Sequence, residues 1–133
     1  MSEIKYKINV SLETGQIIEL YDNCGLPRPT HDKVRIEEMF ANSNLVVSAW
    51  HGAELVGVAR SLTDFVWCCY LADLAVKKEF QKSGVGRRLV EMTREAVGEK
   101  SMVLLLSVPD ALEYYPKIGM KKVDNGFIYN RKY

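Results

Sequence analysis

Residues 74–89 read LAVKKEFQKSGVGRRL and decide both the fold class and the chemistry that this sequence predicts. An apolar run ends at Val76, a polar segment follows, and Gly84 and Gly86 flank Val85. From Val85 onward the apolar positions 85, 89, 92 and 96 recur at helical spacing, which predicts a strand, a short turn and a helix. The first N–H groups of a helix lack partners within the helix, and the helix dipole favours an anion there. Because Lys82 and two arginines add positive charge, the segment predicts a pyrophosphate site.

Two common phosphate-binding loops do not fit this segment. A Walker A loop needs a lysine directly after its last glycine, and here Arg87 follows Gly86. The dinucleotide-binding fingerprint needs a third glycine at the position of Leu89. The two glycines alone are a weak signal, and a helix start with a solvated basic face is the alternative interpretation.

Outward from this segment, the hydrophobic pattern predicts one continuous α/β (α+β) domain over residues 1–133. A mixed, largely antiparallel central sheet flanked by helices is expected. The predicted strands lie at residues 5–10, 45–50, 54–62, 65–76 and 102–108, with a last strand pair around residues 125–126. The predicted helices lie from Thr14 to about Gly25, at residues 31–42 and at residues 85–98. A brief helix is expected after Asp110, which is a plausible N-cap, and Pro116 is expected to limit it.

Composition narrows the class of protein. The chain has 133 residues, of which 47% are hydrophobic and 26% are charged, as in ordinary globular domains. Residues 77–88 hold five basic side chains and one acidic side chain, a sum of +4, whereas the whole chain carries +1. Such a compact cluster fits a small polyanion better than a nucleic acid. No apolar run approaches about 18 residues, so no membrane span is expected.

Cysteine and histidine usage gives two further expectations. Cys68 and Cys69 are adjacent, Cys24 is distant, and no CxxC pair occurs, so a reducing cytoplasm is expected. His31 and His51 are too isolated in the sequence to suggest a metal site, and no metal is expected.

Two motifs resemble those of the GNAT superfamily of N-acetyltransferases. Gln81-x-x-Gly84-x-Gly86, after a strand that ends at Val76, resembles the family's motif A, [RQ]-x-x-G-x-[GA]. YYPKIGM at residues 114–120 is similar to the family's F-Y-x-K-x-G-F segment. The predicted order of elements also matches, and the resemblance spans residues 6 to about 131. More loosely, LYDNCGLP at residues 20–27 is similar to a branch that includes aralkylamine (serotonin-type) acetyltransferases.

The resemblance implies that the chain uses acetyl-coenzyme A (acetyl-CoA) as co-substrate. It implies acetyl transfer to a primary amine of a small molecule by direct attack in a ternary complex, with a homodimer possible. The backbone of the strand end would bind the pantetheine arm, and the N–H groups of the loop would bind the pyrophosphate. The cofactor-binding residues expected on this basis are Leu74, Ala75, Val76, Gln81, Lys82, Ser83, Gly84, Val85, Gly86 and Arg87.

Acetyl transfer to an amine needs a neutral amine and a proton for the leaving thiolate. Tyr115 stands at the family's tyrosine position and is the expected acid, whereas Tyr114 stands where the family prefers phenylalanine and is expected to pack in the core. Asp73, an acid in an apolar strand, is the candidate base, because burial would raise its pKa. The alternative is a structural carboxylate bonded to a backbone N–H or to an arginine.

The loop between the first two helices commonly borders the acceptor pocket in this family. Cys24, Leu26 and Arg28 are therefore the candidate substrate-binding residues, and Arg28 would bind a carboxylate or phosphate or be solvated. A non-catalytic acyl-CoA-binding sensor or partner module is the alternative function. The presence of both Tyr115 and the complete residue 81–86 loop favours an enzyme.

Overall fold

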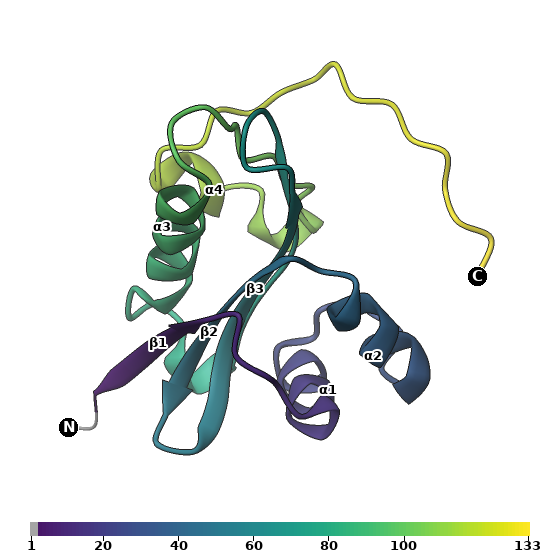
Figure 1. Cartoon of the computed structure of the whole chain (residues 1–133), viewed down its shortest axis with the longest axis vertical. Coiled ribbons are helices and arrows are strands. Elements are labelled where there is room, and N and C mark those ends of the chain that lie inside the picture. Colours follow the sequence, from purple (N-terminus) through teal and green to yellow (C-terminus); the bar gives the residue numbers. More distant parts are fainter. Residues whose placement is uncertain (1–2) are drawn as a thin grey trace.

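A four-stranded antiparallel sheet organises residues 3–133, the part of the chain that the computed structural model describes (Figure 1). Its strands follow the chain order β1-β2-β3-β4. They are β1 (Ile4–Ile8), β2 (Leu45–His51), β3 (Glu54–Thr63) and β4 (Cys69–Val76). A further segment runs parallel to β4 through a bridge between Tyr70 and Leu104. The predicted mixed, largely antiparallel sheet flanked by helices is confirmed.

Helices cover both faces of this sheet. α3 (Val85–Val97) lies on one face, and α1 (Thr14–Cys24) and α2 (Lys33–Ala41) lie on the other (Figure 1). One core cluster joins Val85 and Leu89 of α3 to the sheet, and a second joins Tyr21 of α1 and Ile36 of α2 to it. The middle strands are consequently buried on both faces, and this explains their continuous apolar runs.

Gly57 of β3 lets α3 pack close to the sheet. A Cβ added at Gly57 would lie 3.1 Å from Leu89 Cδ1 and 3.3 Å from Val85 Cγ1. The start of α3 therefore packs directly on the sheet, and this packing fixes where the loop that precedes α3 begins its helix.

Several helices and strands begin or end at other residues than the sequence predicted. α1 begins at Thr14, with Glu13 at the N-cap position, and ends at Cys24. β4 begins at Cys69 and not at residue 65, because Asp64 Oδ1 accepts the N–H groups of residues 66, 67 and 68 in a turn. Asp110 lies in a 3-10 turn (Pro109–Ala111) without capping a helix, and Pro116 lies inside α4 (Tyr114–Lys117).

The two last predicted strands differ most from the structure. Residues 102–108 pair with β4 only around Leu104, whose N–H donates to Cys69 O at 2.8 Å. The predicted strand pair around residues 125–126 is wrong, since residues 120–133 form neither helix nor strand. This segment runs away from the sheet to the C-terminus (yellow in Figure 1). No helix within residues 3–133 is both long and apolar enough to cross a membrane.

Candidate active site

The loop before α3 presents free backbone N–H groups. A short 3-10 turn (Lys78–Phe80) follows β4, and Lys82 and Gly84 then adopt left-handed φ angles of 63° and 89°. Gln81 Nε2 donates to Val76 O at 2.8 Å and ties the loop to the strand end. None of the N–H groups of residues 82–87 donates to an acceptor in the described part of the chain. A Cβ on Gly84 would meet no atom within 4 Å, so the space beside these donors is open to an anion.

Much of the positive charge around this loop is already paired. Lys77 is buried, and its Nζ lies 2.9 Å from Glu19 Oε1 and 2.8 Å from Glu54 Oε2. Arg87 is exposed and Arg88 is half-buried, and both lie within 3.6–3.7 Å of Glu91 on the same helix. The local field at the loop therefore owes less to side-chain charge than the sum of +4 suggested, and more to the backbone donors and the helix dipole.

A gap opens along β4 next to this loop. Leu71 N–H donates to Leu104 O at 2.9 Å, but beyond Leu71 no backbone hydrogen bond joins residues 72–76 to residues 105–108 among the described residues. A pocket of about 80 Å³ lies in the gap. Its lining consists of Leu26, Arg28, Leu71, Ala72, Leu74, Leu105, Leu106, Val108, Ala111 and Tyr115.

This pocket unites residues that the sequence placed in separate segments. Leu26 and Arg28 from the α1–α2 loop, Leu74 from β4 and Tyr115 from α4 all line it. Cys24 does not line it. The Cys24 thiol packs against the core cluster of α1 and α2, where burial raises its pKa. The lining side chains at residues 105–108 were not predicted, because that segment was assigned only as a buried strand.

The two adjacent tyrosines occupy different surroundings. Burial raises the pKa of Tyr115, and Tyr114 adds to the shift, so the Tyr115 hydroxyl stays protonated at neutral pH. The rings of the two tyrosines meet edge to face at 5.2 Å between centroids. The Tyr114 hydroxyl lies 2.9 Å from the position that a Cβ on Gly86 would occupy. Tyr114 therefore covers the start of α3. It belongs to none of the core clusters, which contradicts the expectation that it packs in the core.

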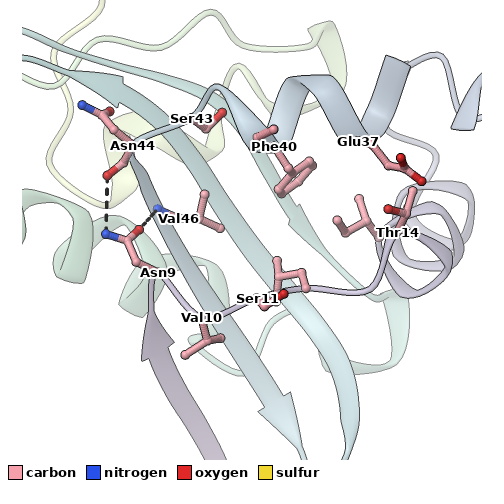
Figure 2. Close-up of a pocket in the computed structure, with 12 residues that line it drawn as sticks. Asn9, Val10, Ser11, Thr14, Glu37, Phe40, Ser43, Asn44 and Val46 are labelled. Carbon is pink, nitrogen blue, oxygen red and sulfur yellow. Dashed lines mark hydrogen bonds between the residues drawn. The ribbon is translucent and has the colours of Figure 1, made fainter. Parts of the chain in front are cut away.

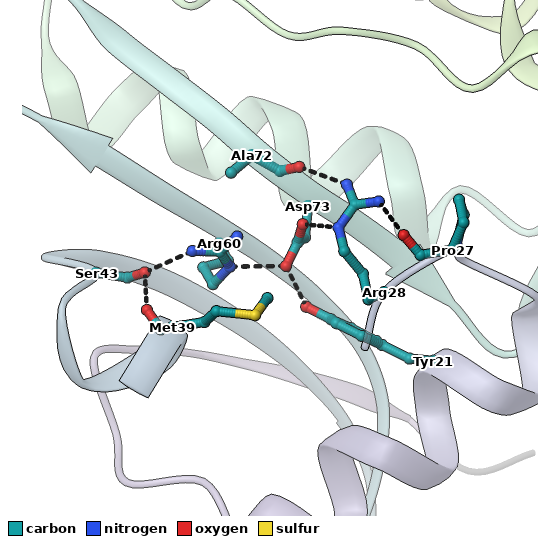
Figure 3. A network of polar contacts seen from close by, with 8 residues as sticks. All are labelled: Tyr21, Pro27, Arg28, Met39, Ser43, Arg60, Ala72 and Asp73. Atoms are coloured by element: carbon teal, nitrogen blue, oxygen red, sulfur yellow. Dashed lines mark hydrogen bonds and ion pairs between the residues drawn. The ribbon is translucent and has the colours of Figure 1, made fainter. Parts of the chain in front are cut away.

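Asp73 lies at the centre of a buried polar network (Figure 3). Its Oδ2 accepts hydrogen bonds from the Tyr21 hydroxyl and from Arg60 Nε, both at 2.7 Å. Its Oδ1 accepts from Arg28 Nε at 2.6 Å, and Arg28 also donates to Ala72 O at 2.9 Å. The Asp73 side chain is fully buried, so both of its oxygens are satisfied by protein donors alone.

These contacts reverse the expected pKa shift of Asp73. Burial of the carboxylate raises its pKa, but the hydrogen bond and charge of Arg60, the charge of Arg28 and the Tyr21 hydroxyl outweigh burial. The pKa of Asp73 is consequently lowered below its usual value of 3.8, and the expectation of a raised pKa is wrong. A base for an ammonium group works best with a pKa near the working pH. This geometry corresponds to the structural carboxylate that was the alternative interpretation.

Arg60 and Tyr21 were missed as partners of this acid. Arg60 faces Asp73 across the β3–β4 pair, next to a register shift between Arg60 and Ser61. An arginine in an otherwise apolar strand, opposite an acid in the next strand, was the available signal. For Tyr21 there was none, because its position on α1 follows the apolar pattern.

A larger hollow of about 630 Å³ lies elsewhere, between the segment after β1 and α2 (Figure 2). Asn9 spans its edge, where Asn9 Oδ1 accepts from Val46 N–H at 2.8 Å and Asn9 Nδ2 donates to Asn44 O at 3.4 Å. None of the predicted site residues lines it, so it is not the candidate active site. No group of three or more His, Cys, Asp or Glu side chains that could hold a metal ion occurs from residue 3 onward.

Comparison with known families identifies the family of this chain. Residues 26–131 match the sequence profile of the acetyltransferase (GNAT) domain family. The chain belongs to the GNAT acetyltransferases. Membership in the GNAT family makes it an acetyl-CoA-dependent acyltransferase.

GNAT relatives resemble it in sequence. An uncharacterised N-acetyltransferase of Pyropia yezoensis, Ycf52, is 26% identical over 93% of this chain and 74% of its own length. An uncharacterised N-acetyltransferase of Bacillus subtilis, YvbK, is 33% identical over 68% of this chain and 55% of its own length. This GNAT chain thus spans only part of each relative.

Solved GNAT structures share the fold. A probable acetyltransferase of unknown function from methicillin-resistant Staphylococcus aureus gives a TM-score of 0.83 at 20% identity, over 97% of this chain and 99% of that chain. The aminoglycoside N-acetyltransferase AAC(6')-Iy in complex with CoA gives a TM-score of 0.75 at 13% identity, over 99% of this chain and 97% of that chain. At these identities the likeness shows the fold alone.

Proposed function

We propose that this GNAT chain transfers an acetyl group from acetyl-CoA to a primary amine of a small molecule, by direct attack in a ternary complex. One observation carries the proposal: the free N–H groups of residues 82–87 lie beside an opened strand edge whose pocket contains a protonated tyrosine. A small-molecule amine is also supported by two aminoglycoside acetyltransferases that share the fold.

The donor would lie along β4 and the loop. The pyrophosphate would accept hydrogen bonds from the N–H groups of residues 82–87, with Lys82 as the nearby exposed cation, and Gln81 would hold the loop in place. The pantetheine arm would enter the gap between residues 74–76 and residues 105–108, where β4 has no strand partner.

Tyr115 would act on the leaving group. When the amine nitrogen attacks the thioester carbonyl carbon, the C–S bond breaks and the sulfur takes up negative charge. The Tyr115 hydroxyl, which is protonated and lines the pocket, would donate its proton to that sulfur. The proton lost by the amine would pass to water, because Asp73 is held as a carboxylate by two arginines.

The acceptor would bind against Leu26 and Arg28. Arg28 is the one predicted substrate-binding residue with a charge at the pocket, and Asp73 fixes its orientation. Asp73 thus serves as a positioning residue in this proposal. A cytoplasmic location and a homodimer remain expectations.

A screen of amines tests the proposed reaction. Polyamines, arylalkylamines, amino acids, aminoglycosides and peptides are each supplied with acetyl-CoA, and free thiol is measured. At least one primary amine should release thiol, with a rate that rises from pH 6 to 8 as the ammonium group loses its proton. Turnover of hydroxyl acceptors alone would refute the amine assignment. Donor binding without thiol release on any acceptor would favour the sensor function.

A substitution at Gly84 tests the donor loop. Acetyl-CoA at about 100 times its Kd should raise the melting temperature of the wild type by roughly 10 °C. Gly84→Asp places a negative charge in the open space beside the free N–H groups and should abolish this rise.

Gly84→Asn is the matched control for that charge. Asparagine has nearly the same shape as aspartate and also tolerates the left-handed φ of 89° at this position. It should retain most of the acetyl-CoA effect, and both variants should melt at similar temperatures without ligand. An equal rise in Gly84→Asp and the wild type would show that the phosphates bind elsewhere.

A further inference from the structure

The hollow of about 630 Å³ beside α2 takes no part in the proposed acetyl transfer (Figure 2). It opens between residues 9–14, α2 and the start of β2, and Ile17 and Val46 form its buried part. Sites for small molecules usually enclose about 300–1,000 Å³ and combine a mostly apolar lining with a few polar groups. The hollow has the size of such a site.

The lining of the hollow contains one charged side chain, Glu37. Its carboxylate forms no ion pair with a residue of the described chain, 3–133. The hydroxyls of Ser11 and Thr14 also line the hollow, and neither has a hydrogen-bond partner in that part of the chain. The rest of the lining is largely apolar and includes Val10, Leu12, Ile17, Phe40, Ala41 and Val46.

The charge of Glu37 favours a cationic ligand. Thr14, the first residue of α1, also lines the hollow, and the start of a helix attracts anions. That attraction corresponds to about half an elementary charge, whereas the exposed Glu37 carries a full one. An apolar wall with one carboxylate at its edge suits a molecule with an apolar body and a single positive charge, such as a protonated amine.

Two residues of the hollow contact Arg60, one of the arginines that hold Asp73. Ser43 Oγ accepts a hydrogen bond from Arg60 Nη1 at 3.1 Å, and Arg60 Cζ lies 5.7 Å from the centroid of the Phe40 ring. Ser43 Oγ also donates to Met39 O at 2.7 Å, so α2 fixes its position. A ligand that packs on Phe40 and Ser43 would therefore act on a side chain that is bonded to Asp73.

The same network ends at the candidate active site (Figure 3). Arg60 Nε donates to Asp73 Oδ2 at 2.7 Å, and Asp73 Oδ1 accepts from Arg28 Nε at 2.6 Å. Arg28 in turn lines the pocket that contains Tyr115. An unbroken series of hydrogen bonds thus joins the hollow to this pocket through the two oxygens of one buried carboxylate.

We propose that the hollow is a second ligand site for a small molecule with an apolar body and one positive charge, and that its occupation raises the affinity for the acceptor at Arg28. A ligand seated against Phe40 and Ser43 would restrict both side chains and, through Arg60 and Asp73, would restrict Arg28. The acceptor then loses less conformational entropy when it binds, because Arg28 is already held. The effect on the acceptor rests on the proposed function, whereas binding in the hollow does not.

Binding in the hollow is tested with N,N-dimethylbenzylamine as the probe. This compound is a cation with an aromatic body and, as a tertiary amine, it forms no stable amide. In amide NMR spectra of the full chain, it should shift the signals of residues 9–14 and 40–46 and leave those of residues 82–87 unchanged. Phenylacetate, an anion with the same benzyl group, should shift none of them. Shifts with both compounds, or with neither, would overturn the proposed site.

Two neighbouring glutamates of α2 provide a variant and its matched control. Glu37→Gln keeps the shape of the side chain and removes its charge, so it should weaken binding of the probe about fivefold, the upper end for an ion pair at an exposed side chain. Glu38→Gln removes the same charge from the same helix but does not change the lining of the hollow, and it should bind the probe like the wild type. Equal weakening in both variants would overturn the role of Glu37.

The Nε–H signals of Arg60 and Arg28 test the connection without any reaction. The probe should shift both signals in the wild type, and Ser43→Ala should still bind the probe but show a smaller shift at Arg28. With the acceptor that the amine screen identifies, a saturating concentration of the probe should lower KM about fivefold, the lower end of typical couplings between sites. No shift at Arg28, or competition between probe and acceptor, would overturn the coupling. Failure of every acceptor while the shifts persist would count against the proposed function alone.

Discussion

Tyr115→Phe is expected to lower the turnover number about 10²-fold while leaving the affinity for acetyl-CoA nearly unchanged. The substitution removes one oxygen and keeps the ring, so the apolar contacts of the pocket persist. The hydroxyl that is lost is the proton donor proposed for the leaving thiolate, and burial keeps it protonated throughout the neutral range. Single-turnover kinetics with a saturating amine measures the chemical step directly, and a thermal shift with acetyl-CoA measures binding.

Tyr114→Phe is the matched control, one residue away on the same short helix. The Tyr114 hydroxyl lies over Gly86 and not in the pocket, so its loss should change turnover less than about threefold. If the two variants exchanged their effects, Tyr114 would be the proton donor. If neither slowed the chemical step, water would be the acid and Tyr115 would only line the pocket.

Asp73→Asn is expected to lower the free energy of unfolding by about 3–5 kcal/mol at pH 7, because it leaves two arginines without their buried counter-charge. Tyr21→Phe removes only the hydroxyl that donates to the same carboxylate, and it should lower the free energy of unfolding by only about 1 kcal/mol. Urea unfolding measures both. Similar losses for the two variants would mean that the ion pairs contribute little to stability.

The pH dependence of this loss follows from the lowered pKa of Asp73. A carboxylate with a lower pKa in the folded state stabilises the fold above its unfolded pKa and loses that contribution as pH falls through the folded pKa. The difference between the wild type and Asp73→Asn should therefore be constant from pH 8 to about pH 5 and shrink below about pH 4.

Activity separates a positioning role from a catalytic base. Because Asp73 is already ionised across the neutral range, the folded Asp73→Asn variant should retain the rise in rate between pH 6 and 8. Its KM for the amine should increase more than its kcat falls, since Arg28 loses its fixed orientation at the pocket. A flattened pH profile with unchanged KM would instead identify Asp73 as the base.

The sequence predicted those parts of the molecule that depend on local pattern. The helical spacing from Val85 located α3, and the glycines at 84 and 86 located the loop with free N–H groups. Gly25 was predicted to end α1, and it adopts a left-handed φ of 72° at that position. In each case the chemistry of neighbouring residues determines the backbone, so a single segment carries enough information.

Features that depend on distant partners were not predictable in the same way. The sign of the pKa shift at Asp73 depends on Arg60, Arg28 and Tyr21, which lie on three other elements. The charge at the loop was overestimated because Lys77 is paired with two glutamates far from it in sequence. The strand pair expected around residues 125–126 failed for a related reason, since an apolar pattern predicts a strand without specifying which edge it will join.

The buried Lys77 has a consequence for the choice of acetyl donor. Its ammonium group links α1 and β3 to the residue that follows β4, and Gln81 links the loop back to Val76. Lys77 and Gln81 thereby fix the distance between the open edge of β4 and the free N–H groups of the loop. If the donor binds as proposed, with its pyrophosphate at the free N–H groups, its thioester carbonyl would reach Tyr115 only when the pantetheine arm has the length that joins these two points. A donor with a shortened pantetheine arm would then occupy either the free N–H groups of residues 82–87 or the pocket at Tyr115, but not both.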